Sequence, residues 1–135
     1  MIRLAAITRV FRMGDQEVRA LNGVTLDIAS GEYVSIMGPS GSGKSTLLNV
    51  IGLLDRPDGG RYELDGRDVT DLSESERAQV RREKIGFVFQ SFHLVPRLTA
   101  AENIELPLIL EGIEAGERRA RVAAALAAFD LEDRA

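Results

Sequence analysis

The nine residues "GPSGSGKST", Gly38 to Thr46, combine the residue types that bind phosphate. Gly38, Gly43, Lys44 and Ser45 fit the spacing G-x-x-x-x-G-K-[ST]. The three glycines of the stretch allow the backbone to curl so that successive N–H groups point inward and form a concave site for anions. In such a loop Lys44 reaches the β- and γ-phosphates of a nucleotide, and the Ser45 hydroxyl can bind Mg²⁺. The stretch therefore predicts a site for a nucleoside triphosphate.

The elements on either side of this loop are those that such a site needs. The short apolar run "YVSIM", residues 33–37, precedes it and is typical of a strand. The segment "KSTLLNVIGLLD", residues 44–55, has apolar side chains at helical spacing and predicts a helix. The loop then ends at a helix N-terminus, where the helix dipole favours negative charge.

Further strands are predicted on both sides of this strand–loop–helix unit. "VTLDIA", residues 24–29, alternates apolar and polar residues, and we expect turns at Asn22-Gly23 and at Ser30-Gly31 on its two sides. "RYELDG", residues 61–66, predicts a short strand that ends in an Asp-Gly turn. "IGFVFQ", residues 85–90, is nearly continuously apolar, as in a strand that is buried on both faces.

Two capping boxes mark the starts of helices. Ser73 with Glu76 predicts a charged helix that runs through about Lys84, and Thr99 with Glu102 predicts another. Pro107 is expected to end or bend the second of these helices. From about residue 115 an alanine-rich helix is predicted, with Val122, Leu126 and Phe129 on one face and its arginines mainly solvated.

Composition limits the possible functions. Seventeen basic and 21 acidic residues give a net charge of −4, which disfavours nucleic acid as a partner. The chain has no cysteine and one histidine, His93, so we expect neither disulfides nor a cysteine or histidine-rich metal site. No secretion signal or membrane-spanning stretch is recognised, so we expect a cytoplasmic chain that reaches a membrane only through a partner.

Two longer stretches narrow the class of phosphate-binding protein. "SGEYVSIMGPSGSGKSTLLNVIGLLDRPDGG" and "GFVFQSFHLVPRLTAAENIELPL" resemble the ATP-binding subunits of ATP-binding cassette (ABC) transporters, most closely the branch that drives lipoprotein release and macrolide export. The resemblance covers nearly the whole chain. It implies an α/β fold of the P-loop NTPase type: an antiparallel β subdomain and part of a parallel-sheet core over residues 1–90, then the start of a helical subdomain over 91–135.

The resemblance also assigns site residues. Gln90 matches the glutamine that senses the γ-phosphate and contacts Mg²⁺. Phe11 matches the aromatic residue that stacks on adenine, although tyrosine is more common there, and Val18 is expected at the edge of the base. Lys44 and Gln90 are the predicted catalytic residues, and Ser45 and Gln90 the predicted Mg²⁺ ligands. The predicted ATP-binding residues are Phe11, Val18, Gly38, Pro39, Ser40, Gly41, Ser42, Gly43, Lys44, Ser45, Thr46 and Gln90.

The resemblance implies two protein partners. The loop after Gln90 would meet transmembrane permease subunits on the inner face of the membrane, and a second ATP-binding subunit would pair head to tail with the first. The predicted permease contacts are Phe92, His93, Leu94, Val95 and Arg97, and an exposed His93 without a partner is an equal alternative.

Three parts of the family pattern do not occur in these 135 residues: an "LSGGQ" signature, four apolar residues followed by Asp-Glu, and the switch histidine. We therefore expect the N-terminal portion of a family member, which binds Mg-ATP but hydrolyses it poorly alone and has marginal stability or self-associates. Three alternatives are a small nucleotide kinase or GTPase, a non-catalytic binding module, and an ABC ATPase of repair or translation. The strings N-K-x-D and D-x-x-G, which a GTPase needs, are both absent.

Overall fold

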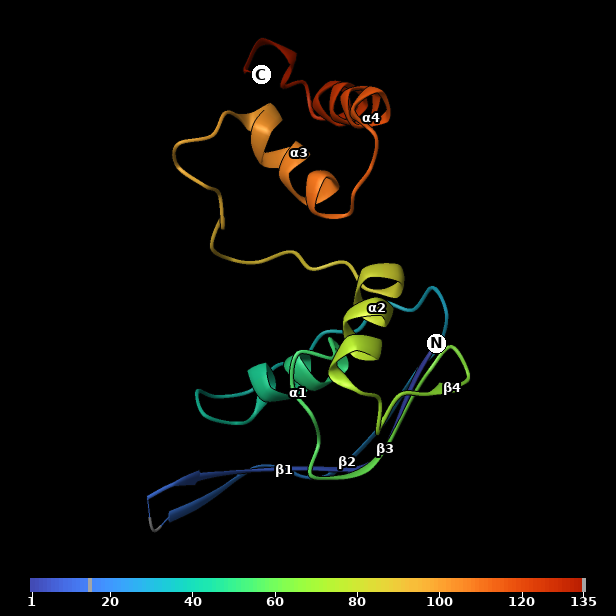
Figure 1. Cartoon of the computed structure of the whole chain (residues 1–135). Coiled ribbons are helices and arrows are strands. Elements are labelled where there is room, and N and C mark those ends of the chain that lie inside the picture. Colours follow the sequence, from blue (N-terminus) through green and yellow to red (C-terminus); the bar gives the residue numbers. More distant parts are fainter. Residues whose placement is uncertain (15, 135) are drawn as a thin grey trace. The chain divides into compact units, whose positions relative to one another are not determined.

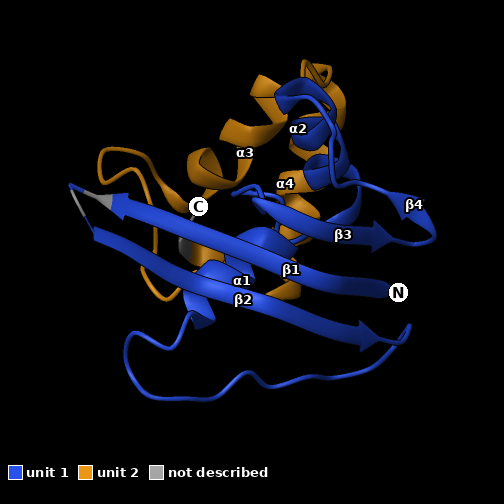
Figure 2. Ribbon diagram, turned by 90° about the horizontal axis from the view of Figure 1, so that it is seen from below, with its two compact units in different colours: residues 1–87 blue, residues 88–135 orange. Residues whose placement is uncertain are grey.

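The computed structural model describes residues 1–14 and 16–134. The chain forms two compact units, residues 1–87 and 88–135, shown in different colours in Figure 2. We describe each unit by itself. The sequence places the change of subdomain at about residue 90, and the units divide between residues 87 and 88.

The first unit contains a four-stranded antiparallel sheet in the order β2-β1-β3-β4 (Figure 1). β1 is Ile2–Met13, β2 is Gln16–Ile28, β3 is Gly59–Leu64 and β4 is Arg67–Asp68. β1 pairs with β2 on one side and with β3 on the other. The predicted antiparallel β subdomain is therefore present, and the predicted Asp65-Gly66 turn joins β3 to β4.

The predicted turn at Asn22-Gly23 is wrong, because β2 continues through both residues. Ile7 pairs with Val24 and Thr8 pairs with Asn22, so Gly23 is the extra residue of a bulge. Its φ of +73° suits glycine at this position. The predicted turn at Ser30-Gly31 is observed.

Two helices complete the first unit: α1, Lys44–Ile51, and α2, Glu74–Lys84. α1 ends at Ile51 with Gly52 as its C-cap, several residues before the predicted end at residue 55. α2 begins with the predicted capping box, in which the Ser73 side chain accepts from the N–H of Glu76 and the Glu76 side chain accepts from the N–H of Ser73.

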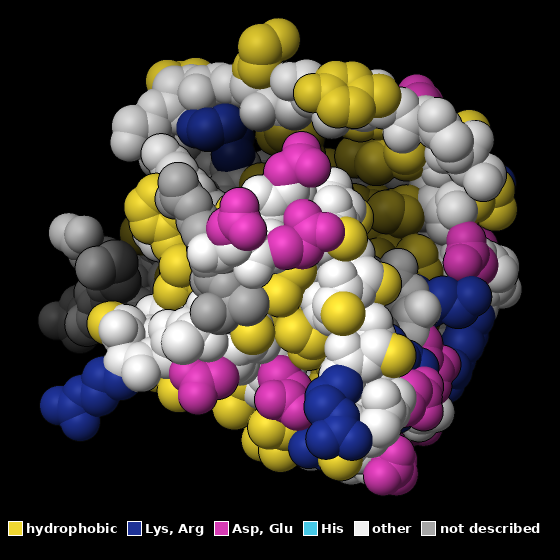
Figure 3. Space-filling model, turned by 90° about the horizontal axis from the view of Figure 1, so that it is seen from above, with side chains coloured by type: hydrophobic (Ala, Val, Ile, Leu, Met, Phe, Trp, Pro, Cys, Tyr) yellow, Lys and Arg dark blue, Asp and Glu magenta, His cyan; other side chains and the backbone are white. Residues whose placement is uncertain are grey.

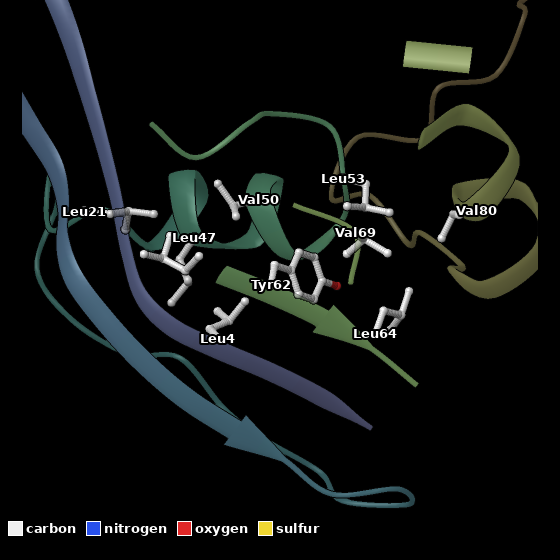
Figure 4. Close-up of a cluster of buried hydrophobic side chains, with 10 residues drawn as sticks. Leu4, Leu21, Leu47, Val50, Leu53, Tyr62, Leu64, Val69 and Val80 are labelled. Atoms are coloured by element: carbon white, nitrogen blue, oxygen red, sulfur yellow. The ribbon is translucent and has the colours of Figure 1, made fainter. Parts of the chain in front are cut away.

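The core of the first unit lies between α1 and the sheet (Figure 4). Leu47 and Val50 of α1 face Leu4 of β1 and Tyr62 of β3 in this view. The Tyr62 hydroxyl donates to the Ile51 carbonyl at 2.7 Å, which ties the end of α1 to the sheet. Burial raises the pKa of Tyr62 to about 12. The buried residues are Leu4, Ile7, Leu21, Leu47, Val50, Leu53, Tyr62, Leu64, Val69 and Val80.

The predicted strands at 33–37 and 85–90 are not strands in the structure. An apolar run becomes a strand only where its backbone finds a ladder partner, and the sheet of the described residues contains only β1–β4. Met37 in the first segment and Val88 in the second are almost fully exposed. On the face shown in Figure 3, hydrophobic side chains come to the surface among charged ones. Self-association of the chain stays a prediction.

The second unit consists of α3, Ala100–Leu110, α4, Ala115–Ala128, and a short 3₁₀ helix, Glu132–Arg134. The predicted capping box of Thr99 and Glu102 opens α3, and Arg118 of α4 donates to Glu105 of α3 at 2.9 Å. Helix α3 continues through Pro107 instead of ending there. On α4, Val122 and Leu126 are buried as predicted, whereas Phe129 caps the end of the helix and is exposed.

Candidate functional site

The loop between Gly38 and Gly43 turns tightly before α1. The N–H of Ser42 donates to the Pro39 carbonyl at 3.3 Å, and Gly41 and Gly43 have φ values of +79° and +86°. Residues other than glycine rarely adopt these backbone angles. The spacing of glycines in the sequence is thus explained by the curvature that the loop has.

Gly43 also packs against the sheet. A Cβ atom at this residue would lie 2.3 Å from the Ala20 carbonyl oxygen of β2, a distance at which the backbone would have to move. The first turn of α1 therefore lies directly beside β2, at the end of the hairpin that carries Phe11 and Val18.

The N-terminus of α1 has no side-chain cap and no acidic residue in its first turn. The helices α2 and α3, by contrast, are capped by their own side chains. The first N–H groups of a helix need partners, and the helix dipole makes an anion a favourable one. At α1 these N–H groups follow directly on the curved loop, which is the arrangement that binds phosphate.

Lys44 supplies a positive charge at the same place. Its ammonium donates to the Pro39 carbonyl at 2.6 Å and to the Ser42 hydroxyl at 3.5 Å, so its side chain turns back along the loop. Both acceptors are neutral oxygens. Within the described residues, no carboxylate forms an ion pair with Lys44. The charge of Lys44 is therefore available to an anionic ligand.

A hollow of about 290 Å³ joins this loop to the β1–β2 hairpin. An aromatic ring and an aliphatic side chain, Phe11 and Val18, form one part of its lining, and the start of α1 forms another. The residues that line it are Phe11, Val18, Arg19, Ala20, Gly41, Gly43, Lys44, Ser45 and Thr46. The geometry fits a nucleotide: an apolar wall for a base, then a cation and free helix N–H groups for phosphates.

Several predicted residues lie elsewhere. Gly38, Pro39 and Ser42 line a second hollow of about 400 Å³, which shares Gly43 and Lys44 with the first. Ser40 is exposed and lines neither hollow. Arg19 and Ala20 line the first hollow but were not among the predicted site residues, because only the pairing of β2 with β1 brings them there.

Gln90 is exposed and belongs to the second unit. Its predicted joint action with Ser45 on Mg²⁺ therefore stays a prediction. Nearby, His93 has a φ of +49°, and its ring lies edge-on to Phe89 with 4.6 Å between the ring centroids.

The second half of the loop after Gln90 is hydrogen-bonded to Asn103, a residue that is not among the predicted site residues. Its amide accepts from the Val95 N–H at 2.8 Å and donates to the Leu98 carbonyl at 3.1 Å. Phe92 and Leu94 are exposed, 89% and 63% of their surface. Asn103 thus ties Val95 and Leu98 to α3, and the side chains of Phe92, Leu94 and Arg97 stay accessible. The only feature of the sequence that could have indicated this role is the position of Asn103, one residue after the capping-box glutamate Glu102.

Comparison with known proteins identifies the family. The family model described as "ABC transporter" matches residues 21–135. This chain belongs to the ABC transporter family. The matched region includes α1 and the whole glycine-rich loop of residues 38–43. None of the helices in residues 1–14 and 16–134 is long and apolar enough to cross a membrane.

Individual members of the ABC transporter family are similar over almost all of the chain. The macrolide export ATP-binding/permease protein MacB of Brucella abortus is 56% identical over 134 residues, which are 99% of this chain and 21% of MacB. The ABC transporter ATP-binding protein YknY of Bacillus subtilis is 51% identical, and the match covers 58% of YknY. The chain thus spans about a fifth of the length of MacB and less than three fifths of YknY.

Solved structures agree with the fold. The dimeric, post-hydrolysis structure of the ATP-binding cassette MJ0796 bound to ADP and Pi has a TM-score of 0.85 and 49% identity, covering 99% of this chain and 59% of that one. A second dimeric structure of MJ0796 gives the same TM-score at 50% identity. The predicted α/β fold of an ABC ATPase is therefore confirmed. The chain corresponds to the N-terminal portion of that fold.

Proposed function

We propose that this chain binds Mg-ATP as the nucleotide-binding part of an ABC transporter. The observation that carries the proposal is the hollow that unites Phe11 and Val18 with Lys44 and the uncapped start of α1. In this proposal the Phe11 ring stacks on adenine and Val18 contacts its edge. Stacking needs the flat face of the ring, so phenylalanine serves as well as the more common tyrosine.

The phosphates lie at the other part of the hollow. The N–H groups of the loop and of the first turn of α1 donate to phosphate oxygens, and Lys44 releases the Pro39 carbonyl to bind the β- and γ-phosphates. Mg²⁺ would be held by Ser45 and Gln90 together with phosphate oxygens, and it would neutralise charge on the phosphates. A nearby cluster of carboxylates is not needed for this, because Mg²⁺ in nucleotide sites keeps water and phosphate ligands.

Hydrolysis requires more than these residues supply. Orientation of the attacking water needs a suitably placed polar or carboxylate group, and stabilisation of the transition state needs further donors. Residues 1–135 contain neither the "LSGGQ" signature nor an apolar run followed by Asp-Glu. We propose that the 135 residues bind Mg-ATP with negligible turnover, and that turnover arises in a head-to-tail dimer of complete subunits.

The proposed role in the cell is to power export through separate permease subunits, of the macrolide or lipoprotein type, on the cytoplasmic face of the membrane. The exposed apolar side chains Phe92, Leu94 and Val95, with His93 and Arg97 beside them, are the proposed contact with the permease. The anchoring of this loop by Asn103 supports a preformed contact surface. A basic surface for nucleic acid is not expected from a chain of net charge −4.

Calorimetric titration of the chain with ATP, with and without Mg²⁺, tests the proposal. We expect the wild-type chain to bind ATP more tightly with Mg²⁺ and the Ser45→Ala variant to lose most of this gain. Ser35→Ala, an exposed serine outside both hollows, is the matched control. If the titration detects no binding of ATP to the wild-type chain, the proposal is overturned. Robust release of phosphate by the 135 residues would overturn the part concerning turnover.

A further inference from the structure

The guanidinium of Arg9 lies over the ring of Phe11, with 4.7 Å between its central carbon and the ring centroid. The two residues are two positions apart on β1, so their side chains leave the strand on the same face. A cation at this distance from a ring is attracted to the negative face of the π system. Arg9 therefore contacts the ring to which the proposed function gives adenine.

Arg9 is held in place by two aspartates of the segment that follows α1. Asp55 accepts two hydrogen bonds from the guanidinium, at 2.8 and 2.9 Å, and Asp58 accepts a third at 2.9 Å. A two-fold hydrogen bond from arginine to a carboxylate fixes the plane of the guanidinium as well as its position. Only 21% of the Arg9 side chain is exposed.

One of the two aspartates, Asp58, is also hydrogen-bonded to the backbone of β1. Asp58 accepts from the Val10 N–H at 2.6 Å, and its own N–H donates to the Thr8 carbonyl at 2.8 Å. The segment from Asp55 to Asp58 is therefore bound to β1 on both sides of Arg9. The pKa of Arg9 is raised, mainly by the hydrogen bond of its guanidinium to Asp55. Arg9 therefore stays charged at any working pH.

Phe11 lines the hollow beside the phosphate-binding loop, whereas Arg9 does not. Some 37% of the surface of Phe11 is exposed. The ring is thus covered by the guanidinium on one side and remains accessible where it borders the hollow. A stacking ring that can rotate freely loses entropy when a base binds, and a ring that is already held does not.

We propose that Arg9, fixed by Asp55 and Asp58, is a positioning residue that orients the Phe11 ring for stacking on the purine base of the nucleotide. This inference rests on the proposed function and deepens it, since it assigns a role to the segment after α1 that the phosphate-binding loop does not explain. Arg9 acts through Phe11 and does not touch the phosphates.

The test compares ATP with inorganic triphosphate, which has the phosphates but no base. Affinities for both are measured by calorimetry for the wild type, Arg9→Met, Phe11→Ala and the double variant. We expect Arg9→Met to bind ATP roughly three- to tenfold more weakly, the size of a partly buried cation–π contact, with unchanged affinity for inorganic triphosphate. In the Phe11→Ala background the same substitution is expected to have no further effect on ATP.

Two further variants separate positioning from general stability. Arg9→Lys keeps the charge but cannot make the two-fold hydrogen bond with Asp55, so an intermediate loss of ATP affinity is expected in a chain that retains its fold. Arg3→Met, which removes an exposed ion pair of the same strand with Asp27, is the matched control and should bind both ligands as the wild type does.

The outcomes are distinguishable. Equal weakening of ATP and inorganic triphosphate by Arg9→Met and Arg9→Lys would overturn the positioning role, as would an undiminished effect in the Phe11→Ala background. If Phe11→Ala itself leaves the ratio of the two affinities unchanged, stacking on Phe11 is wrong and the proposed function fails in that part, whatever Arg9 does.

Discussion

Phe11 of β1 is paired directly with Val18 of β2 in the antiparallel hairpin, and both side chains line the hollow beside the glycine-rich loop of residues 38–43. The pairing places an aromatic and an aliphatic side chain next to each other, about 5 Å apart in such a ladder, on the surface of the sheet. The hairpin therefore contributes an apolar wall to a site whose charged part comes from α1, some 30 residues later in the chain.

Replacement of Val18 by alanine should weaken ATP binding selectively. Val18 is 47% exposed, so removal of its two methyl groups should cost about 0.5–1 kcal/mol of binding free energy, or roughly two- to fivefold in affinity. Affinity for inorganic triphosphate should not change. Calorimetric titration measures both, and Ile109→Ala on α3, a residue with 48% exposure, is the control that should affect neither. An equal loss for both ligands would contradict a contact with the base.

Two glycines of the loop should differ in how they tolerate alanine. Both have positive φ, which costs roughly 1–2 kcal/mol for alanine at either residue. At Gly41 the added Cβ meets nothing within 4 Å, whereas at Gly43 it collides with the Ala20 carbonyl. We expect Gly43→Ala to lower the free energy of unfolding by about 2–4 kcal/mol and to abolish ATP binding. Urea unfolding of both variants and of the wild type measures the free energies of unfolding. If Gly41→Ala and Gly43→Ala are destabilised equally, the close approach of Gly43 to β2 is wrong.

The capping box of α2 should make stability depend on pH. The Ser73 hydroxyl and N–H both donate to Glu76, and these hydrogen bonds lower the pKa of Glu76 below its ordinary value of 4.5. Because the pKa is lower in the folded state, the contribution is present above the unfolded value and is lost as the pH falls through the folded one. The urea midpoint of Glu76→Gln should lie below that of the wild type near neutral pH. Once the pH lies below the lowered pKa of Glu76, the two midpoints should converge.

The control for this titration is Glu83→Gln, an exposed glutamate of the same helix that accepts from Gln79 and caps nothing. Its free energy of unfolding should stay within about 0.5 kcal/mol of that of the wild type. A difference between wild type and Glu76→Gln that persists undiminished at low pH would mean that the carboxylate charge is not what stabilises the cap.

Features that depend on neighbouring residues could be predicted from the sequence. The curved loop, the two capping boxes and the Asp65-Gly66 turn each follow from residue types a few positions apart, and all are present in the structure. The common hollow of Phe11 and Val18 with Lys44 agrees with the residues that the family resemblance assigned. Their binding of ATP stays a prediction until it is measured.

Features that depend on distant partners could not be predicted. The bulge at Gly23 is set by the register of β2 against β1, and the same dipeptide in isolation favours a turn. The apolar runs 33–37 and 85–90 have the composition of strands, but composition does not supply a ladder partner. The contact of Arg9 with Phe11 needs the aspartates after α1, about 46 residues away, to hold the guanidinium.

The most direct test of the central claim, that this chain binds the triphosphate of Mg-ATP at the loop before α1, is the ATP affinity of Lys44→Ala. Loss of charge-assisted hydrogen bonds to the phosphates should weaken ATP and inorganic triphosphate alike, by about 1.5–3 kcal/mol or roughly ten- to over a hundredfold. Lys84→Ala, the other lysine, which pairs with Asp65 on the surface, should bind as the wild type does. Unchanged ATP affinity in Lys44→Ala would contradict the claim and would favour a loop that is retained for structure alone.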